Sequence, residues 1–553
     1  MNTKTKYCIY AYSLILIVCS FMQSAGAVNP ILPAWEFIPD GEPYVFDDPD
    51  RPGRQRVYLY GSHDSLKDAY CGRELVLWSA DVDSLNSWRY DGIIFESKTD
   101  AQGKNFREDA RGDVLYAPDI CEVTNGDGSK TYYIYPNNQA GGRKNMVAKS
   151  ARPDGPFEVC NWSSVDPRRA EGCMDFDPAV FIDDDGRVYG YWGINTSWAA
   201  ELDPTTMASV KPGTSIVKDM IPSKNQDNLF RFFEASSIRK IEGKYVFIYS
   251  RWTADGDFGL PQSNYTLAYA YADAPLGPYT YGGTIIDGRA RDTNPSGKSI
   301  FTACPNGNTH GSIVKIKDRW WVFYHRQTGK DEYSRQAMVA PIDVSVHDGK
   351  VFISEGEYNS EGFETEGLNP YKKYEAGIAC YYTSPRPAEH NWPRKTFFGS
   401  YIASGRDSDF IPVQGGSHNP VINNTEASVV GYKYFNFDAC HGDKSLRLKL
   451  ELVPQGQNGH IDIFIGNPQK NGVKVGRINI SSKLDSNKET NKDSAQKRLV
   501  CLSARVPKIA RLNGKHALFL RFHLDSPQEN APHADSCSLS PASLCELHYI
   551  NFE

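Results

Sequence analysis

Three acidic residues begin or flank strand-like segments, and together they could do acid–base chemistry. They are Asp40, Asp177 and Glu234, which lie far apart in the chain. Hydrolysis of a glycosidic bond needs one carboxyl group as acid and another as base or nucleophile, facing each other across the bond. The aromatic pair 232–233 gives Glu234 an apolar setting, which would raise its pKa as an acid working near neutral pH requires. A single carboxylate at a turn is usually only solvated or a cap, so the prediction rests on the joint spacing of the three.

A weak internal repeat supplies the elements that would position these carboxylates. Five short aromatic and β-branched runs recur, each typical of a strand, with starts roughly 75, 56, 57 and 75 residues apart; they are 57–60, 132–135, 188–191, 245–249 and 320–324. Repeated β units at such a period favour an all-β fold, a β-propeller in which each blade is one four-stranded sheet. Five units predict five blades. The alternative is an array of β-sandwiches with accidental similarity.

Residues 29–355 resemble glycoside hydrolase family 43, whose members include α-L-arabinofuranosidases, β-xylosidases and arabinanases. The family fold is a five-bladed propeller, in agreement with the repeat. The motifs that carry the resemblance appear in order and at blade spacing: Asp40-Gly41-Glu42-Pro43-Tyr44-Val45-Phe46, Tyr58-Leu59-Tyr60-Gly61-Ser62-His63-Asp64, Tyr116-Ala117-Pro118-Asp119, Asp177-Pro178-Ala179-Val180-Phe181, Phe233-Glu234-Ala235 and Thr309-His310-Gly311-Ser312.

The resemblance implies a role for each carboxylate. Asp40 matches the general base, Asp177 the carboxylate that orients the acid and tunes its pKa, and Glu234 the general acid. The implied reaction is a single displacement with inversion, in which a water lies between base and sugar. The first motif departs from many relatives, which have Asp directly before Pro, so Glu42 is a rival for the base. Two residues apart, Glu42 and Asp40 would share one face of an extended strand.

Other matched or neighbouring residues have weaker assignments. Tyr116 is expected to line the substrate pocket, and Asp119 to be structural. Arg326 either hydrogen-bonds substrate hydroxyls or a carboxylate, or forms an ordinary structural pair. Trp192 and Trp252 are either pocket walls or core.

The resemblance implies no required cofactor. His310 matches a histidine that the family often places near a central cation, held largely through waters. The alternative is a histidine that fills the inner packing of the propeller. Calcium prefers oxygen ligands, so one histidine is weak evidence for a structural Ca²⁺.

The chain divides into four stretches. Residues 1–27 are expected to be a signal peptide, 28–355 the catalytic propeller, 356–375 a polar linker, and 376–553 a β-sandwich, because several short strand-like runs there are separated by turn residues. This last stretch loosely resembles a family 6 carbohydrate-binding module. It either binds sugar or only supports the propeller.

Net charge and targeting signals argue against a nucleic-acid-binding or membrane-spanning protein and favour an exported one. The net charge is −6, and loss of Lys4 and Lys6 with the signal peptide would make it −8. No basic stripe suggests a nucleic-acid partner, and no segment beyond the signal approaches the length of a transmembrane span. Lys4, Lys6, an apolar stretch and Ala25-Gly26-Ala27 predict export to the periplasm or the medium. Cys19 is a weaker candidate for a lipoprotein anchor, because Val18 before it is bulky.

Ten of the 12 cysteines lie beyond the signal, and an oxidising compartment permits disulfides. Cys160 with Cys173, and Cys537 with Cys545, are close enough in sequence to pair. The cysteines show no zinc-type spacing.

The sequence therefore predicts an inverting glycosidase, an α-L-arabinofuranosidase or β-xylosidase, that releases arabinofuranose or xylose from plant hemicellulose such as arabinoxylan or arabinan. Its partner is a polysaccharide or oligosaccharide substrate, and the oligomeric state is not indicated. Two alternatives remain open. One is the same fold acting on other furanosides or on internal arabinan linkages, and the other is a non-catalytic sugar-binding propeller.

Overall fold

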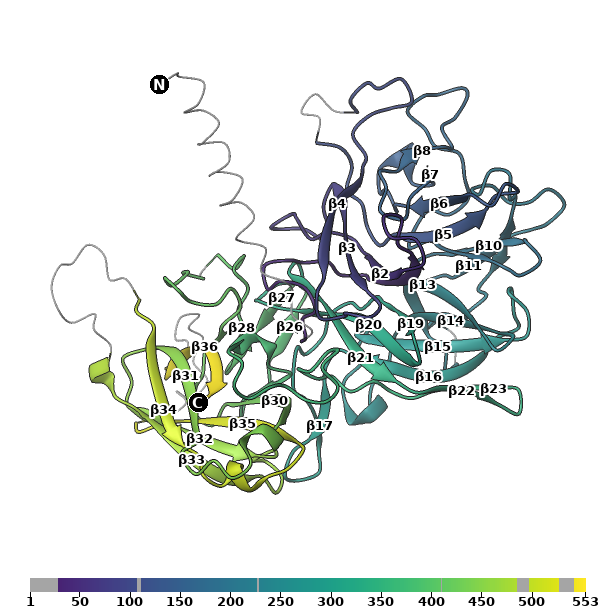
Figure 1. Cartoon of the computed structure of the whole chain (residues 1–553). Helices are drawn as coiled ribbons and strands as arrows, with labels where there is room; N and C mark the ends of the chain where they lie inside the picture. The colour runs from purple at the N-terminus through teal and green to yellow at the C-terminus, as the bar shows by residue number, and fades with distance from the viewer. Residues whose placement is uncertain (1–27, 107–110, 226–227, 409, 485–496, 527–541) are drawn as a thin grey trace, which may run out of the picture.

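The computed structural model describes residues 28–106, 111–225, 228–408, 410–484, 497–526 and 542–553 (Figure 1). Regular structure in these residues is almost wholly β-strand, and the only helices are 3-10 turns of three residues. The prediction of an all-β chain is confirmed. The expected signal peptide, 1–27, lies outside the described residues. Within them, no helix is both long and apolar enough to cross a membrane.

Five antiparallel sheets follow one another in the first part of the chain (Figure 1). Four have four strands and the fifth has three, and in each sheet the strands pair in chain order. The strands are β1 (Glu42–Asp47), β2 (Gln55–Tyr60), β3 (Glu74–Asp81) and β4 (Arg89–Glu96); β5 (Asp119–Thr124), β6 (Lys130–Tyr135), β7 (Ala148–Ser150) and β8 (Glu158–Val159); β9 (Ala179–Ile182), β10 (Val188–Trp192), β11 (Trp198–Leu202) and β12 (Val217–Lys218); β13 (Phe232–Ile241), β14 (Lys244–Arg251), β15 (Thr266–Ala272) and β16 (Thr280–Asp287); and β19 (Ser312–Ile316), β20 (Arg319–Gln327) and β21 (Arg335–Ile342).

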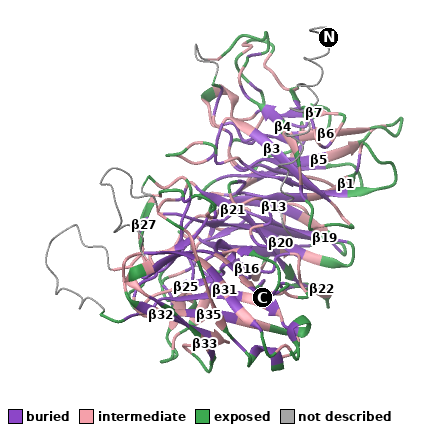
Figure 2. Cartoon of the chain, turned by 60° about the vertical axis from the view of Figure 1, so that its left-hand side comes forward, coloured by how far each residue is buried: buried purple, intermediate pink, exposed green. Residues whose placement is uncertain are grey.

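The five repeated runs are the second strands of the five sheets, β2, β6, β10, β14 and β20. β2, β10, β14 and β20 are buried along almost their whole length, and β6 is buried at three of its six residues. Buried residues dominate the interior of the sheets (Figure 2). Apolar clusters fill the space between consecutive sheets; one of them joins Tyr58 and Tyr60 of β2 to Ile120 and Ile134 of the next sheet. Burial on both faces explains why each run is continuously aromatic and β-branched rather than alternating.

The first strands of the sheets lie next to one another. β5 contacts β9, β9 contacts β13, β13 contacts β19, and β19 contacts β1. Tyr44 of β1 donates a hydrogen bond to Asp119 of β5 (2.7 Å), which joins the first and second sheets. The residues just before these strands therefore gather at one end of the array. Ile31 also donates a backbone hydrogen bond to Ala337 of β21 (3.1 Å), so the start of the described chain packs on the fifth sheet.

Two larger antiparallel sheets form the C-terminal part. One contains β28, β29, β36, β31 and β34 in that order, with β24 also paired to β36, and the other contains β25, β30, β35, β32 and β33. Their bounds are β24 (Tyr374–Glu375), β25 (Tyr381–Thr383), β28 (Tyr401–Ile402), β29 (Val421–Ile422), β30 (Val429–Asn436), β31 (Arg447–Pro454), β32 (Gly459–Ile465), β33 (Val473–Ile480), β34 (Val500–Arg505), β35 (Lys515–Leu524) and β36 (Cys545–Phe552).

Three separate two-stranded hairpins complete the described strands. They are β17 (Arg291–Thr293) with β18 (Ser299–Phe301), β22 (Val344–His347) with β23 (Lys350–Ile353), and β26 (Glu389–Asn391) with β27 (Arg394–Thr396).

One apolar cluster is shared by both parts of the chain. It contains Ile248 and Tyr324 from the fourth and fifth sheets together with Leu450 and Ile463 from the two C-terminal sheets. The stretch 356–375, expected to be a polar linker, contributes Tyr358 and Leu368, both buried in this cluster. The stretch was expected to be a linker because most of its residues are polar, but its few apolar side chains are buried and anchor it. It is therefore packed chain rather than a free connection.

The described cysteines are free thiols. Cys160 and Cys173, whose spacing permitted a disulfide, are not joined. Cys545 is also free and buried, and Cys537 lies outside the described residues.

Candidate active site

The three predicted carboxylates line one pocket of about 580 Å³. Asp40 comes from the residues before the first sheet, Asp177 from the residues before the third, and Glu234 from the first strand of the fourth. All three side chains are at least nine-tenths buried. Residues separated by almost 200 positions in the sequence thus converge, as the repeat predicted.

Two glycines bring Asp40 and His310 together. Gly41 and Gly311 form a parallel β-bridge between the starts of the first and fifth sheets. A Cβ on Gly311 would lie 2.0 Å from the Phe323 carbonyl oxygen, and one on Gly41 would lie 2.6 Å from Leu59 Cδ1. These atoms belong to the second strand of the same sheet in each case, so glycine lets the start of the first and fifth sheets pack closely on β2 and β20. The residue before each glycine is therefore placed at the pocket.

The Asp40 carboxylate is held by two donors. Arg335 Nη1 donates to Oδ1 at 3.0 Å, and Ser62 Oγ donates to Oδ2 at 2.5 Å. Burial is the largest single influence and acts to raise the pKa of Asp40, but the Arg335 guanidinium, together with His325, His310 and the Ser62 hydrogen bond, lowers the pKa below its usual value. Asp40 also adopts a left-handed backbone conformation, φ 59°, of the kind that gathers at functional sites. Asp40 is therefore ionised at neutral pH and can accept a proton.

His325 supports Asp40 from behind. The Asp40 backbone N–H donates to His325 Nδ1 (3.2 Å), and His325 Nε2 lies 3.0 Å from the Asn308 carbonyl oxygen. Burial lowers the pKa of His325 to about 3, although Asp40 acts in the other direction. The ring is therefore neutral and carries its proton on Nε2, so both nitrogens serve to fix the Asp40 backbone.

Asp177 lies between the neighbouring sheets. Its Oδ1 accepts from Asn137 Nδ2 (2.8 Å) and its Oδ2 accepts from the Ala235 backbone N–H (3.1 Å). Burial, followed by the charge of Asp40, raises its pKa to about 8. The bond to Ala235 ties Asp177 to the residue directly after Glu234, which suits a role in positioning Glu234.

Glu234 occupies an irregular part of β13. The pairing of β13 with β14 shifts register on both sides of Glu234, and such bulges re-aim side chains near active sites. Burial and then the charge of Asp177 raise its pKa well above the usual value. Phe233 and Trp252 pack edge to face at 5.2 Å and both line the pocket, whereas Phe232 belongs to the core. Glu234 is therefore protonated at neutral pH and can donate a proton.

The rival base, Glu42, does not line this pocket. It is buried and pairs with Arg239 at 2.9 Å. Asp119, expected to be structural, accepts hydrogen bonds from Tyr44 (2.7 Å) and from the Val180 backbone (2.7 Å). Both carboxylates thus belong to the packing between the first strands, and the geometry favours Asp40 as the base.

Among the other predicted residues, Tyr116 and Trp252 line the pocket, and Trp192 is core. Arg326 does not reach the pocket. Its guanidinium is fully buried and donates to Gln336 and to the carbonyl oxygens of residues 377 and 379. The substrate-binding assignment of Arg326 is therefore corrected: it joins the fifth sheet to the C-terminal part. The strand alternates sides, and Arg326 points away from its neighbour His325.

A C-terminal hairpin supplies one wall of the pocket. His390 and Trp392, from the β26–β27 hairpin, both line it. His390 Nε2 lies 2.5 Å from Glu332 Oε1, and Tyr70 donates to the other oxygen of Glu332. Trp392 is 69% exposed. Because the hairpin is anchored and the Trp392 indole is accessible, Trp392 can contact the part of a bound ligand that extends out of the pocket.

His310 lines the pocket, but its donor set suits a cation only through water. Nδ1 lies 3.6 Å from Asp177 Oδ2, and Nε2 is buried with no hydrogen-bond partner among the described residues. Burial lowers the pKa of His310 to about 4, so the ring is neutral. A water, or a hydrated cation, would satisfy Nε2. In the described residues the single group of three close ligand atoms is instead in the C-terminal part, at His460, Asp462 and His523.

Sequence reasoning missed Arg335 and the hairpin. Arg335 begins a strand that is otherwise mostly apolar, and a charged residue in such a strand needs a buried partner. That pattern was a usable signal. The hairpin residues carry no comparable signal. They follow the five sheets in the sequence, and only the folded chain brings them to the pocket.

The sequence is similar to those of known glycosidases. The sequence model described as "Glycosyl hydrolases family 43" matches residues 49–350, a range that starts after Asp40. A xylosidase/arabinosidase of Thermoclostridium stercorarium is 32% identical over 480 residues, covering 81% of this chain and 89% of the relative. An arabinoxylan arabinofuranohydrolase of Paenibacillus polymyxa is 27% identical over 383 residues, covering 64% and 55%. A solved family 43 arabinoxylan arabinofuranohydrolase from Bacillus subtilis covers 96% of this chain and 97% of its own, at 20% identity and a TM-score of 0.44.

Proposed function

Because the chain belongs to glycosyl hydrolases family 43 and is a glycosidase, we propose that it releases arabinofuranose or xylose from plant hemicellulose, arabinoxylan or arabinan. The substrate class is supported by the relatives, which are named xylosidase/arabinosidase and arabinoxylan arabinofuranohydrolase. One observation carries the mechanism: two carboxyl groups in one pocket have environments that push their pKa values in opposite directions.

Asp40 and Glu234 are this pair. The guanidinium of Arg335 helps to keep Asp40 ionised, while burial, the largest influence on Glu234, keeps Glu234 protonated. Carboxyl groups whose environments separate their pKa values are the mark of an acid and a base working together at one pH. A sugar-binding protein without catalysis has no need of this arrangement.

In the proposed reaction Asp40 removes a proton from a water as the water oxygen attacks the anomeric carbon. The glycosidic C–O bond breaks, and Glu234 gives its proton to the departing oxygen. Asp177 holds the backbone after Glu234 and keeps the Glu234 proton in place. The result is hydrolysis in a single displacement with inversion, after which solvent returns Asp40 and Glu234 to their starting protonation.

We also propose that the five sheets are the blades of a β-propeller over 28–355 and that 376–553 is a β-sandwich. Chain-order pairing in each sheet, the side-by-side first strands and the packing of Ile31 on β21 support a closed ring. The two C-terminal sheets, whose apolar residues share one cluster, support a sandwich. A Ca²⁺ held through waters at His310, and export directed by residues 1–27, are further parts of the proposal.

Glu234→Gln tests the assignment. Release of 4-nitrophenol from the α-L-arabinofuranoside and β-D-xyloside is compared with sugar release from arabinoxylan and arabinan. Loss of a general acid costs about 10²–10⁴-fold, and the loss should be larger on polysaccharide, because nitrophenolate leaves without a proton. ¹H NMR of the first product anomer tests inversion. Near-normal turnover of polysaccharide by a folded Glu234→Gln variant would refute the role of Glu234.

A further inference from the structure

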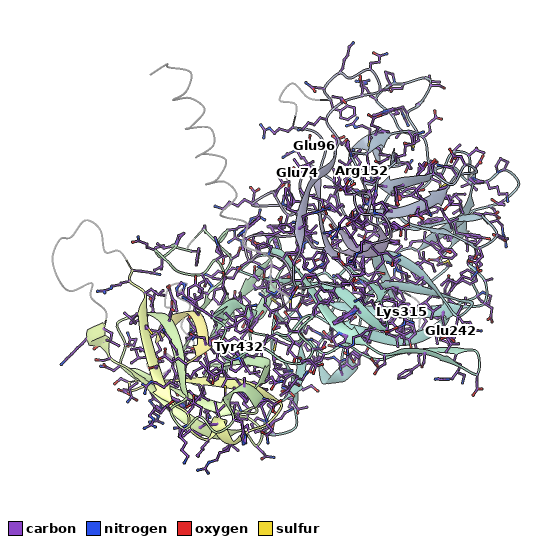
Figure 3. The ribbon with its side chains drawn as sticks, in the orientation of Figure 1. Glu74, Glu96, Arg152, Glu242, Lys315 and Tyr432 are labelled. Atoms are coloured by element: carbon purple, nitrogen blue, oxygen red, sulfur yellow. The ribbon has the colours of Figure 1, made fainter. Side chains whose placement is uncertain are left out.

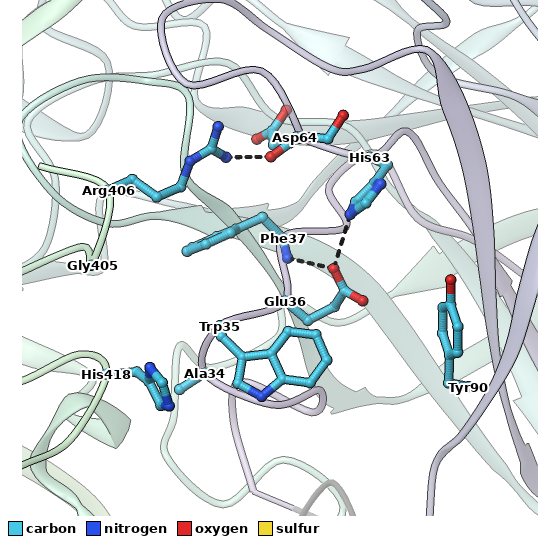
Figure 4. Close-up of a pocket in the computed structure, with 11 residues that line it drawn as sticks. Ala34, Trp35, Glu36, Phe37, His63, Asp64, Tyr90, Gly405, Arg406 and His418 are labelled. Carbon is cyan, nitrogen blue, oxygen red and sulfur yellow. Dashed lines mark hydrogen bonds and ion pairs between the residues drawn. The ribbon is translucent and has the colours of Figure 1, made fainter. Parts of the chain in front are cut away.

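A second cavity lies beside the first sheet, apart from the three carboxylates. Its volume is about 600 Å³, and Figure 4 shows its lining. The segment before β1, the residues after β2, and Tyr90 of β4 form one side, while Arg406 and His418 of the C-terminal part form the other. None of its residues has a role in the proposed mechanism.

Two exposed aromatic rings stand in this cavity on a buried third ring. Trp35 is 52% exposed and Tyr90 is 42% exposed, whereas Trp78 behind them is 5% exposed. The ring centroids of Trp35 and Trp78 are 6.3 Å apart, and those of Trp78 and Tyr90 are 5.4 Å apart. Accessible rings held by a buried neighbour are preorganised, and clustered exposed apolar surface usually marks a binding site.

The polar edge of the cavity is also fixed. Glu36 accepts hydrogen bonds from the Phe37 backbone N–H (3.1 Å) and from Trp78 Nε1 (2.8 Å), and it pairs with His63 at 3.2 Å. Although burial acts to lower it, the pKa of His63 is raised to about 9 by hydrogen bonds to Glu36 and to Glu74, the residue labelled in Figure 3. Both histidine nitrogens and both carboxylates are thus engaged with one another. The imidazolium offsets one of the two carboxylate charges and leaves a net charge of −1, so this edge suits the hydroxyl donors of a neutral sugar better than an anionic ligand.

We propose that this cavity is a second carbohydrate site, which binds the neutral main chain of the polysaccharide with pyranose faces on Trp35 and Tyr90. The hydroxyl groups of the sugar would meet the Glu36–His63 edge. A pocket with apolar rings and a few convergent polar groups is the usual form of a small-ligand site. The proposal rests on the proposed function for the identity of the polysaccharide.

The position of the cavity gives the second site a purpose. Asp64 lines it, and the Asp64 carboxylate accepts from Arg335 Nη2 (2.8 Å), while Arg335 Nη1 binds Asp40 in the active pocket. The two cavities therefore lie on opposite sides of one buried ion-pair network. A main chain bound in the second site is kept next to the active pocket, which raises the local concentration of its branches.

The test is affinity electrophoresis of the full chain through gels that contain soluble arabinoxylan, which measures retardation by the polysaccharide rather than release of sugar. Trp35→Ala and Tyr90→Ala should weaken binding about tenfold each, the scale of losing an aromatic anchor. Trp35→Phe, which keeps a ring, should recover most of it. Phe352→Ala is the matched control, because Phe352 is 61% exposed on β23 and lines neither cavity.

Activity on the 4-nitrophenyl glycosides should be unchanged in all these variants. On arabinoxylan, kcat/KM should fall for Trp35→Ala and stay near the wild-type value for Trp35→Phe and Phe352→Ala. A Trp35→Ala protein that migrates like the wild type in arabinoxylan gels overturns the proposal. Absence of retardation of the wild type overturns it as well. Failure of the proposed function appears differently, as a wild type that is retarded but hydrolyses none of the glycosides.

Discussion

Arg335 is the residue whose replacement most directly tests how the base is kept ionised. Its side chain is almost completely buried, and it binds Asp40 at 3.0 Å and Asp64 at 2.8 Å. Arg335→Met keeps much of the volume and removes the charge. Arg335→Lys keeps a charge but loses the planar fork that reaches two carboxylates at once. The acid limb of the pH profile of kcat/KM should move in both variants.

The size of the effect follows from the environment of Asp40. An opposite charge at this distance lowers a carboxyl pKa by about 1–3 units, so Arg335→Met should raise the acid-limb pKa by about that amount, and Arg335→Lys by less. Breaking a buried ion pair costs about 3–5 kcal/mol of folding free energy. Because the lowered pKa of Asp40 stabilises the fold above its unfolded pKa, the deficit should be full at pH 7. It should shrink as the pH falls and Asp40 becomes protonated in both proteins.

The assays are kcat/KM for a 4-nitrophenyl glycoside from pH 3 to 9 and urea unfolding at several pH values. Arg326→Met is the matched control: Arg326 is equally buried but binds Gln336 and backbone carbonyls. It should lose stability and leave the acid limb in place. An unmoved acid limb in folded Arg335→Met, or an equal shift in Arg326→Met, would refute the argument.

Three further predictions use the same molecule. Asp177→Asn removes the charge that helps to raise the pKa of Glu234, so the alkaline limb of kcat/KM should move to lower pH and kcat should fall; an unchanged alkaline limb contradicts the role of Asp177. Trp392→Ala should raise KM for arabinoxylan severalfold with little change in the nitrophenyl assay, whereas equal losses on both would mean that the hairpin only supports folding. Cys160 is exposed and free, so a maleimide should label it without reductant, and labelling only after reduction would reveal a disulfide.

Much of the strand pattern could be predicted, because buried strands require runs of aromatic and β-branched residues that are visible in the sequence. The five aromatic runs became second strands, and the runs at 473–480 and 547–552 became β33 and part of β36. Strand β34 (Val500–Arg505) was not predicted, since its residues are mostly half-exposed and its sequence lacks a clear alternation.

The three carboxylates were also predictable, because each lies within two residues of the start of the first strand of a sheet. Partners such as Arg335 were not, because a buried ion pair depends on which strands become neighbours. Arg326 illustrates the same limit. It adjoins the supporting residue His325 in sequence, but alternation along β20 turns its side chain toward residues 377–379.

The shared apolar cluster and the hairpin at 389–396 bear on how such an enzyme could be re-engineered or could have evolved. The C-terminal part is not an independent domain that can be deleted or replaced by another domain. A shortened chain would expose half of a common core and lose a wall of its pocket, so recombination in this lineage should have moved the two parts together.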